Sequence, residues 1–277
     1  MIAAADIKAC CVAAYSSPVA AWLLGTRFHP GGAALTERLI RALAVGPGNL
    51  VADIACGLGE SSFQVACSTG ARTIGIDLSA DSIAAARRAA AGAGPAGSVE
   101  FVVADAEALP LEDGAVDGVL CECSLCTFPD KQRAAAELAR VLKPGGRLAL
   151  SDVIAEQHRL PSSLRTLDAW VACLADAQPL RELVELLLGA GLRAEVVERH
   201  DDALARLLDR VDARLRLARA GLAAEGEVGL IERGLDLVAA ARESVELGIL
   251  GYAVVVARRP ADGSDATRSR MGASNLV

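Results

Sequence analysis

Three short segments carry glycines and carboxylates at the ends of predicted strands. The first runs from Asp53 to Gly59 (DIACGLG), after an apolar run and before a predicted helix. Small residues at such a strand-to-helix turn let the backbone approach a ligand and direct the amides of the helix N-terminus towards it. Gly57 and Gly59 are the positions on which this prediction depends. The turn by itself is also compatible with a tight loop that binds nothing.

Two carboxylates follow at the ends of the next two strands. Asp77 closes the second strand, where an acid can accept hydrogen bonds from both hydroxyls of a ribose. Asp105 leaves the third strand where an adenine ring would lie, so its carboxylate could accept from the exocyclic amine while the Ala106 amide faces a ring nitrogen. Leu78, next to Asp77, and Glu122, at the end of the fourth strand, are assigned to the same site.

Together with DAEALP (105–110) and LKPGG (142–146), these segments resemble class I S-adenosylmethionine-dependent methyltransferases over residues 45–155. The family pattern DxGxGxG has Ala55 in place of its first glycine. The resemblance implies a Rossmann-like α/β fold and S-adenosylmethionine as cofactor. A dinucleotide reductase would use a similar turn, but it lacks the DAEALP and LKPGG elements, and its third glycine is absent here. The residues assigned to the cofactor are Asp53, Ala55, Gly57, Gly59, Asp77, Leu78, Asp105, Ala106 and Glu122.

Thiols stand where a methyl acceptor is expected, above the carboxyl ends of the fourth and fifth strands. The fourth strand ends in CECSLC, which contains Cys123 and Cys126. Cys10 and Cys11 lie in the N-terminal segment, and Cys173 follows the fifth strand. Both of these segments commonly fold over the acceptor pocket in this fold.

This arrangement resembles the bacterial and algal arsenite methyltransferases, which carry an Ala-Cys-Cys near the N-terminus and single cysteines at the other two places. The resemblance implies that Cys123 and Cys173 bind trivalent arsenic, with Cys10 or Cys11 as the third thiolate, and that these four residues are catalytic. Soft arsenic(III) prefers sulfur ligands, and its lone pair is the nucleophile, so no general base is needed. Glu122 in place of the family's Asn, and the additional Cys126, depart from that pattern.

Other acceptors and another class of function remain open at this point. Tellurium, selenium, antimony or an organic thiol could replace arsenic. A small organic metabolite is a further acceptor, with the cysteines incidental, and a non-catalytic metalloid- or cofactor-binding protein is the alternative outside enzymes. Cysteine is often only a small buried hydrophobe, and Cys56, Cys67 and Cys121 are assigned to packing. His29 is expected to be a loop residue.

Strands alternate with helices along the first half of the chain, and the strands are continuous apolar runs, which is typical of a parallel sheet covered on both faces. The final strand, 251–257, is expected to be antiparallel. Four segments are predicted: an irregular N-terminal cap (1–32), the cofactor-binding core (33–157), substrate-side helices and final strands (158–259), and a disordered tail (260–277). Expected strands are 50–54, 73–76, 99–104, 116–121, 147–153, 193–198 and 251–257; expected helices are 33–44, 60–68, 80–91, 130–142, two within 162–189, and 202–246.

Bulk properties limit the partners. The chain has 277 residues, a formal net charge of −7 and a sequence pI of about 5.1, so nucleic acid is not expected as a partner. No apolar run reaches the ~18 residues that a membrane helix needs, and the protein is predicted to be cytoplasmic, with its eight cysteines mostly reduced and no structural zinc. The expected partners are a small-molecule or metalloid substrate and a cellular thiol reductant, with the protein as a monomer or dimer.

Overall fold

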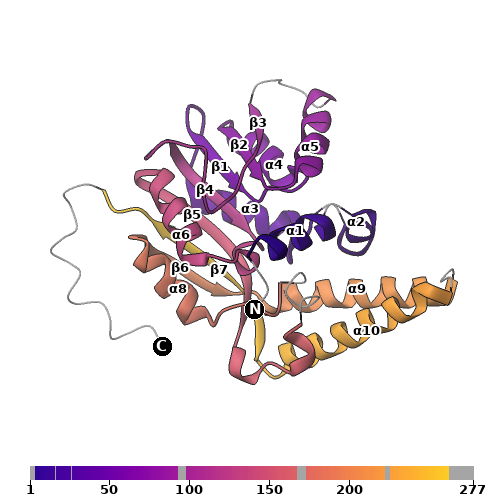
Figure 1. The fold of residues 1–277 in the computed structure, drawn as a ribbon. Helices are drawn as coiled ribbons and strands as arrows, with labels where there is room; N and C mark the ends of the chain where they lie inside the picture. Colours follow the sequence, from indigo (N-terminus) through magenta and orange to yellow (C-terminus); the bar gives the residue numbers. More distant parts are fainter. Residues whose placement is uncertain are drawn as a thin grey trace.

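A seven-stranded sheet forms the centre of the protein (Figure 1). The computed structural model describes residues 4–15, 17–25, 27–92, 98–166, 173–221 and 225–261. The strand order is β3-β2-β1-β4-β5-β7-β6; β1 to β5 pair in parallel, and β7 is antiparallel to both β5 and β6. This is the Rossmann-like sheet that the sequence predicted. The strands are β1 (Leu50–Ile54), β2 (Arg72–Asp77), β3 (Val99–Val103), β4 (Val116–Glu122), β5 (Leu142–Ala155), β6 (Arg193–Arg199) and β7 (Leu250–Arg258).

Helices cover both faces of the sheet because successive strand residues point to opposite sides. On one face, alternate residues such as Val51 and Leu120 pack with α3, α9 and α10. On the other face, Ala52 and Val119 pack with α6 and α8. The helices are α1 (Ala4–Tyr15), α2 (Pro18–Leu24), α3 (Gly32–Leu43), α4 (Glu60–Thr69), α5 (Ala80–Gly92), α6 (Lys131–Val141), α8 (Leu180–Gly189), α9 (Asp201–Gly221) and α10 (Glu225–Glu246), with short 3-10 turns at Leu125–Thr127, Gln157–Arg159 and Ser162–Leu164.

Three expectations about local structure were wrong. The N-terminal segment, predicted to be irregular, contains α1 and α2. Residues 173–179, predicted to be helical, form turns that lead into α8. β5 begins at Leu142, directly after α6, so the LKPGG segment belongs to the strand instead of preceding it. Residues 167–172 and the tail beyond residue 261 lie outside the described residues.

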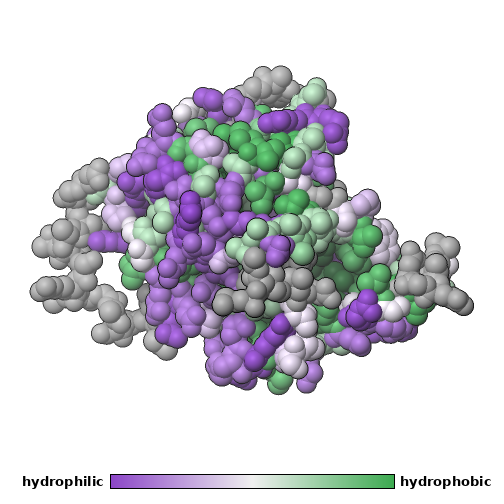
Figure 2. Space-filling model, viewed as in Figure 1, coloured by the Kyte–Doolittle hydropathy of each residue, from purple (hydrophilic) through white to green (hydrophobic). Residues whose placement is uncertain are grey.

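The arrangement of the helices around the sheet leaves one side of the molecule more apolar than the other. α9 and α10 lie side by side as a long hairpin, and α2 lies above α9, where Arg214 donates hydrogen bonds to the carbonyls of Trp22 and Leu23 (Figure 1). Apolar side chains gather on the side where α1 and α2 lie, whereas the side over α6 and α8 is largely hydrophilic (Figure 2). Among the described residues, only α1 and α2 taken together, across a 68° bend, have the length and composition of a membrane-spanning helix; no single helix does.

Candidate active site

The turn between β1 and α4 opens the candidate cofactor pocket. Ala55 (φ 57°), Gly57 (φ 53°) and Gly59 (φ 82°) all adopt left-handed backbone conformations. Such a conformation is rare for a residue with a side chain, so Ala55 holds a strained position where the family has glycine. The chain turns sharply enough to start α4 at Glu60 directly beside the end of β2. The α4 N-terminus and a bare stretch of backbone therefore face the pocket.

Asp53 and Asp77 stabilise this turn and the start of α4 through hydrogen bonds. The Asp77 carboxylate accepts hydrogen bonds from the amides of Gly57 and Ser79, each at 2.8 Å. Asp53 accepts one from the Ser62 hydroxyl at 2.5 Å, and burial raises its pKa to about 7. Burial also raises the pKa of Asp77, although the backbone amides partly oppose this. A carboxylate has about four acceptor sites, and the amides of Gly57, Leu78 and Ser79 take three of those of Asp77, so it can still accept from a ribose hydroxyl.

Asp105, predicted to lie beside the adenine ring, is paired with a lysine from the N-terminal helix. Lys8 of α1 places its Nζ atom 2.6 Å from Asp105 Oδ2 and 2.6 Å from Glu107 Oε2. Burial would raise the pKa of Asp105, but the hydrogen bonds from Lys8 and from the Glu107 amide lower it overall. Asp105 is therefore an ionised acceptor, and α1 is fastened over this end of the pocket.

Glu122, at the end of β4, is the centre of a buried polar network. Its carboxylate, only 5% exposed, accepts hydrogen bonds from Thr36 Oγ1 at 3.0 Å and Ser61 Oγ at 2.6 Å. His29 Nε2 lies 3.7 Å from the same carboxylate and 3.4 Å from the Thr36 hydroxyl. The loop before α3, α3 itself and α4 are thus joined to the end of β4 through one carboxylate.

Three thiols from two distant segments meet beside this network. Cys123, after β4, and Cys173, after β5, both adopt left-handed backbone conformations, with φ of 51° and 64°. The Cys173 thiol contacts those of Cys123 and Cys126, and its Sγ lies 3.2 Å from the Tyr15 hydroxyl and 3.7 Å from the Cys123 carbonyl oxygen. Hydrogen bonds from Cys123, Cys126 and Tyr15 lower the pKa of Cys173. Tyr15 thus fastens the second end of α1.

One pocket connects most of these groups. It includes about 1180 Å³ of empty space, part of which is open to solvent. Of the residues predicted for the cofactor, all but Gly59 line it; Gly59 instead starts α4 and packs against Phe101. Of the predicted thiols, Cys11 and Cys123 line the pocket, whereas Cys173 is buried behind Tyr15. Cys10 lies on α1, half-buried and outside the pocket lining.

The structure adds site residues that the sequence reasoning missed. Lys8, Tyr15 and Arg27 line the pocket, and His29, expected to be an ordinary loop residue, is buried in its wall. Burial of an imidazole is not visible in a sequence, and no spacing relates Lys8 to Asp105. Cys126 joins the thiol cluster in the position that the sequence reasoning gave to Cys10 or Cys11. Within the described residues, no group of three or more Cys, His, Asp or Glu side chains is arranged to hold a metal ion.

Comparison with known proteins identifies relatives that are methyltransferases. Residues 52–150 match a methyltransferase domain. The chain is 34% identical over 233 residues to the O-methyltransferase resE of Aspergillus sclerotiorum, covering 81% of this chain and 82% of that one. It is 32% identical over 253 residues to the 27-O-demethylrifamycin SV methyltransferase of Amycolatopsis mediterranei, covering 82% and 83%. An arsenite methyltransferase of Halobacterium salinarum is 32% identical over 163 residues, only 58% of this chain and 41% of the relative.

Solved structures share the fold. The [4+2]-cyclase SpnF superposes with a TM-score of 0.69 at 25% identity, over 82% of this chain and 80% of that one. A phosphoethanolamine N-methyltransferase of Haemonchus contortus, solved with S-adenosyl-L-methionine, superposes with a TM-score of 0.73 at 19% identity, over 90% of this chain and 56% of that one. Because one fold hosts several reactions, the acceptor has to be argued from the site.

Proposed function

Because this chain belongs to the S-adenosylmethionine-dependent methyltransferase family, we propose that it methylates a hydroxyl oxygen of a small, largely apolar organic molecule. The proposal starts from the acceptor side of the pocket, where Val12, Tyr15, Phe28 and Phe128 supply apolar and aromatic walls. Such walls suit an organic acceptor. Three relatives that align with about four-fifths of this chain are named as O-methyltransferases, in agreement with this choice.

The cofactor, S-adenosylmethionine, supplies an electrophilic methyl group on a sulfonium. The proposed roles of the chain's own residues are to orient that donor and to remove the acceptor's proton. Asp77 accepts from the ribose hydroxyls, and Asp105 with the Ala106 amide reads the edge of the adenine. The turn from Ala55 to Gly57 leaves the backbone bare, so that the donor can lie against it.

His29 carries the proposal, because a hydroxyl must lose its proton as the new bond to carbon forms. It is the one imidazole among the residues that line the pocket. Its Nε2 lies 3.7 Å from the Glu122 carboxylate, which would stabilise the imidazolium that proton transfer creates. A positioned imidazole contributes typically about 10²- to 10⁴-fold to such a step.

The test uses tritiated S-adenosylmethionine with 27-O-demethylrifamycin SV and a set of simple phenols as acceptors. His29→Gln should lower kcat about 100-fold or more, while the Kd for S-adenosylhomocysteine stays unchanged. His158→Gln is the matched control, because His158 is 75% exposed and outside the pocket lining. Undiminished turnover by His29→Gln would exclude His29 as the base.

A second candidate acceptor, trivalent arsenic, is favoured by the thiol cluster. Cys123, Cys126 and Cys173 meet at the end of β4, and the low pKa of Cys173 favours the thiolate form that binds arsenic. Tyr15 lies against Cys173 in this structure, so arsenic binding at Cys123 and Cys173 requires α1 to move, with Cys126, Cys11 or a cellular thiol as the third ligand.

Arsenite, glutathione and labelled S-adenosylmethionine provide the corresponding experiment, with methylated products separated by chromatography. Cys123→Ser and Cys173→Ser should each abolish arsenic methylation and leave cofactor binding intact. Cys67→Ser is the matched control, because Cys67 is exposed on α4, far from the cluster in the chain. Production of methylated arsenic by either cluster variant would remove the thiolate assignment.

A further inference from the structure

The cofactor pocket is unusually rich in carboxylates for a ligand that itself carries one. S-adenosylmethionine bears an ammonium, a sulfonium and a carboxylate. Its two positive groups suit acidic walls, but its carboxylate needs a positive partner. Only two of the lining side chains described are permanently cationic, Lys8 and Arg27. The lining acids are Asp53, Glu60, Asp77, Asp105 and Glu122.

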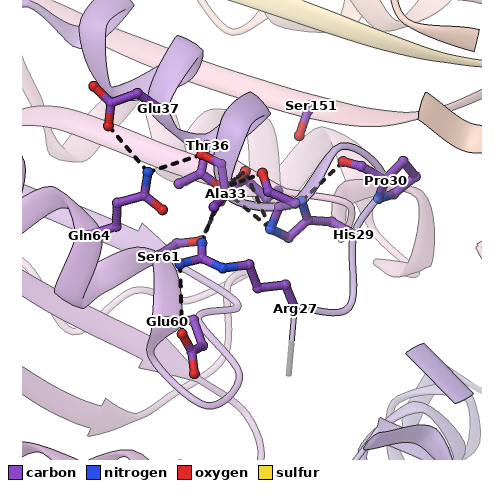
Figure 3. Close-up of polar contacts among 12 residues, drawn as sticks. Arg27, His29, Pro30, Ala33, Thr36, Glu37, Glu60, Ser61, Gln64 and Ser151 are labelled. Carbon is purple, nitrogen blue, oxygen red and sulfur yellow. Dashed lines mark hydrogen bonds and ion pairs between the residues drawn. The ribbon is translucent and has the colours of Figure 1, made fainter. Parts of the chain in front are cut away.

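The two cations lie at opposite ends of the pocket. Lys8 is held between Asp105 and Glu107, beyond the end of β3. Arg27 faces Glu60 in the first turn of α4 (Figure 3). Since the strands run β3-β2-β1-β4 across the sheet, a ligand with its adenine at β3 and its ribose at β2 extends its methionyl group towards α4 and β4. Arg27 is therefore the cation at the methionyl end.

The contacts of Arg27 are long, so its guanidinium remains able to donate shorter hydrogen bonds to a bound carboxylate. Its Nη2 lies 3.7 Å from Glu60 Oε2, and its Nη1 lies 3.5 Å from Thr36 Oγ1. Both contacts are long for charge-assisted hydrogen bonds, which are normally about 2.7–2.9 Å. The Arg27 side chain is only 21% exposed, whereas Glu60 is 44% exposed, so Glu60 can turn towards solvent at little cost.

We propose that Arg27 binds the carboxylate of the cofactor's methionyl group, taking it in place of Glu60. The planar guanidinium matches a carboxylate through two parallel hydrogen bonds, and the N-terminus of the adjacent α4 favours the same negative charge. Arg27 thereby fixes the end of the donor nearest its reactive methyl group. This assignment concerns the donor alone and holds whichever acceptor the enzyme uses.

Isothermal titration of the full-length protein with three ligands tests this assignment without any turnover. The ligands are S-adenosylmethionine, S-adenosylhomocysteine and decarboxylated S-adenosylmethionine, which lacks only the carboxylate. Arg27→Gln should weaken the first two about 10- to 100-fold, the usual value of a charge-assisted hydrogen bond, and leave the Kd of the decarboxylated ligand unchanged. Arg27→Lys keeps the charge but cannot form two parallel hydrogen bonds, so its Kd for the first two ligands should lie between those of the wild type and Arg27→Gln.

The matched control is Arg41→Gln, which removes an arginine on α3 that is 64% exposed and paired with Glu37. It should bind all three ligands as the wild type does. Equal weakening of all three ligands by Arg27→Gln would mean that Arg27 only supports the loop before α3, and unchanged binding would mean that it has no role; either result overturns the proposal. Because no acceptor is present, failure of the hydroxyl proposal leaves this measurement unaffected.

Discussion

Replacement of Gly59 by alanine should destabilise the protein through two separable effects. Gly59 has a φ of 82°, and a Cβ atom built there would lie 2.5 Å from Phe101 Cζ and 2.7 Å from Phe101 Cε1. A left-handed backbone costs a residue with a side chain about 1–2 kcal/mol, and overpacking of a filled core costs about 1–3 kcal/mol. Gly59→Ala should therefore lower the free energy of unfolding by about 2–5 kcal/mol.

The ring cannot easily move aside to reduce this cost. Phe101 packs edge-on against Phe63, with ring centroids 5.5 Å apart, and is only 5% exposed. Gly48→Ala isolates the backbone effect, because Gly48 has a φ of 87° with no atom within 4 Å of its notional Cβ. That control should cost only about 1–2 kcal/mol.

Urea unfolding followed by circular dichroism measures both variants, with an unchanged m-value as the condition for comparing them. In the background of Phe101→Leu, which removes the far edge of the ring, Gly59→Ala should cost less than in the wild type. The reasoning fails if Gly59→Ala costs no more than Gly48→Ala, or if Phe101→Leu leaves its cost unchanged.

Three further predictions concern charge and thiol burial. Lys8→Met should lower the free energy of unfolding by about 1 kcal/mol at neutral pH. Because Lys8 lowers the pKa of Asp105 below its ordinary value of 3.8, this difference should shrink progressively when urea unfolding is repeated as the pH falls from 3.8 through that lowered pKa. Burial raises the pKa of Asp53 to about 7, so the folded state binds more protons than the unfolded state between about pH 4 and pH 7, and stability falls as pH rises across that window. Asp53→Asn should reduce this fall, and an unchanged slope would contradict it. Iodoacetamide followed by peptide mass spectrometry should label exposed Cys67 well before buried Cys173; equal rates would contradict the burial of the cluster.

The proximity of the residues assigned to the cofactor could be predicted from the sequence because each of them lies in a local strand-end segment. The turn from Asp53 to Gly59 joins one strand to the next helix, and Asp77 and Asp105 each end a strand. Parallel strands that pair side by side bring their carboxyl ends to one edge of the sheet. Once the sequence shows the strands, the topology places these residues together without further information.

The N-terminal helix illustrates what the sequence left undecided. Its residues AADIKACCVAAY have no distinct apolar stripe, and only Ile7 is buried, so helical periodicity is not visible. What holds α1 over the pocket is tertiary: Lys8 pairs with Asp105 and Glu107, and Tyr15 contacts Cys173. Each partner lies some hundred residues or more away in the chain.

The composition of the thiol cluster and the cations of the pocket were decided only by tertiary structure. The resemblance to arsenite methyltransferases pointed to Cys123 and Cys173, but the turn at Leu125–Thr127 brings Cys126 to them, while α1 keeps Cys10 outside the pocket lining. Likewise, Lys8 and Arg27 are ordinary basic residues until the fold sets them at opposite ends of one acidic pocket. The positions of strand-end residues can be predicted from local sequence patterns because strand pairing brings the ends of parallel strands to one edge of the sheet. The positions of residues on the N-terminal helix and on loops depend instead on the tertiary contacts that these segments make.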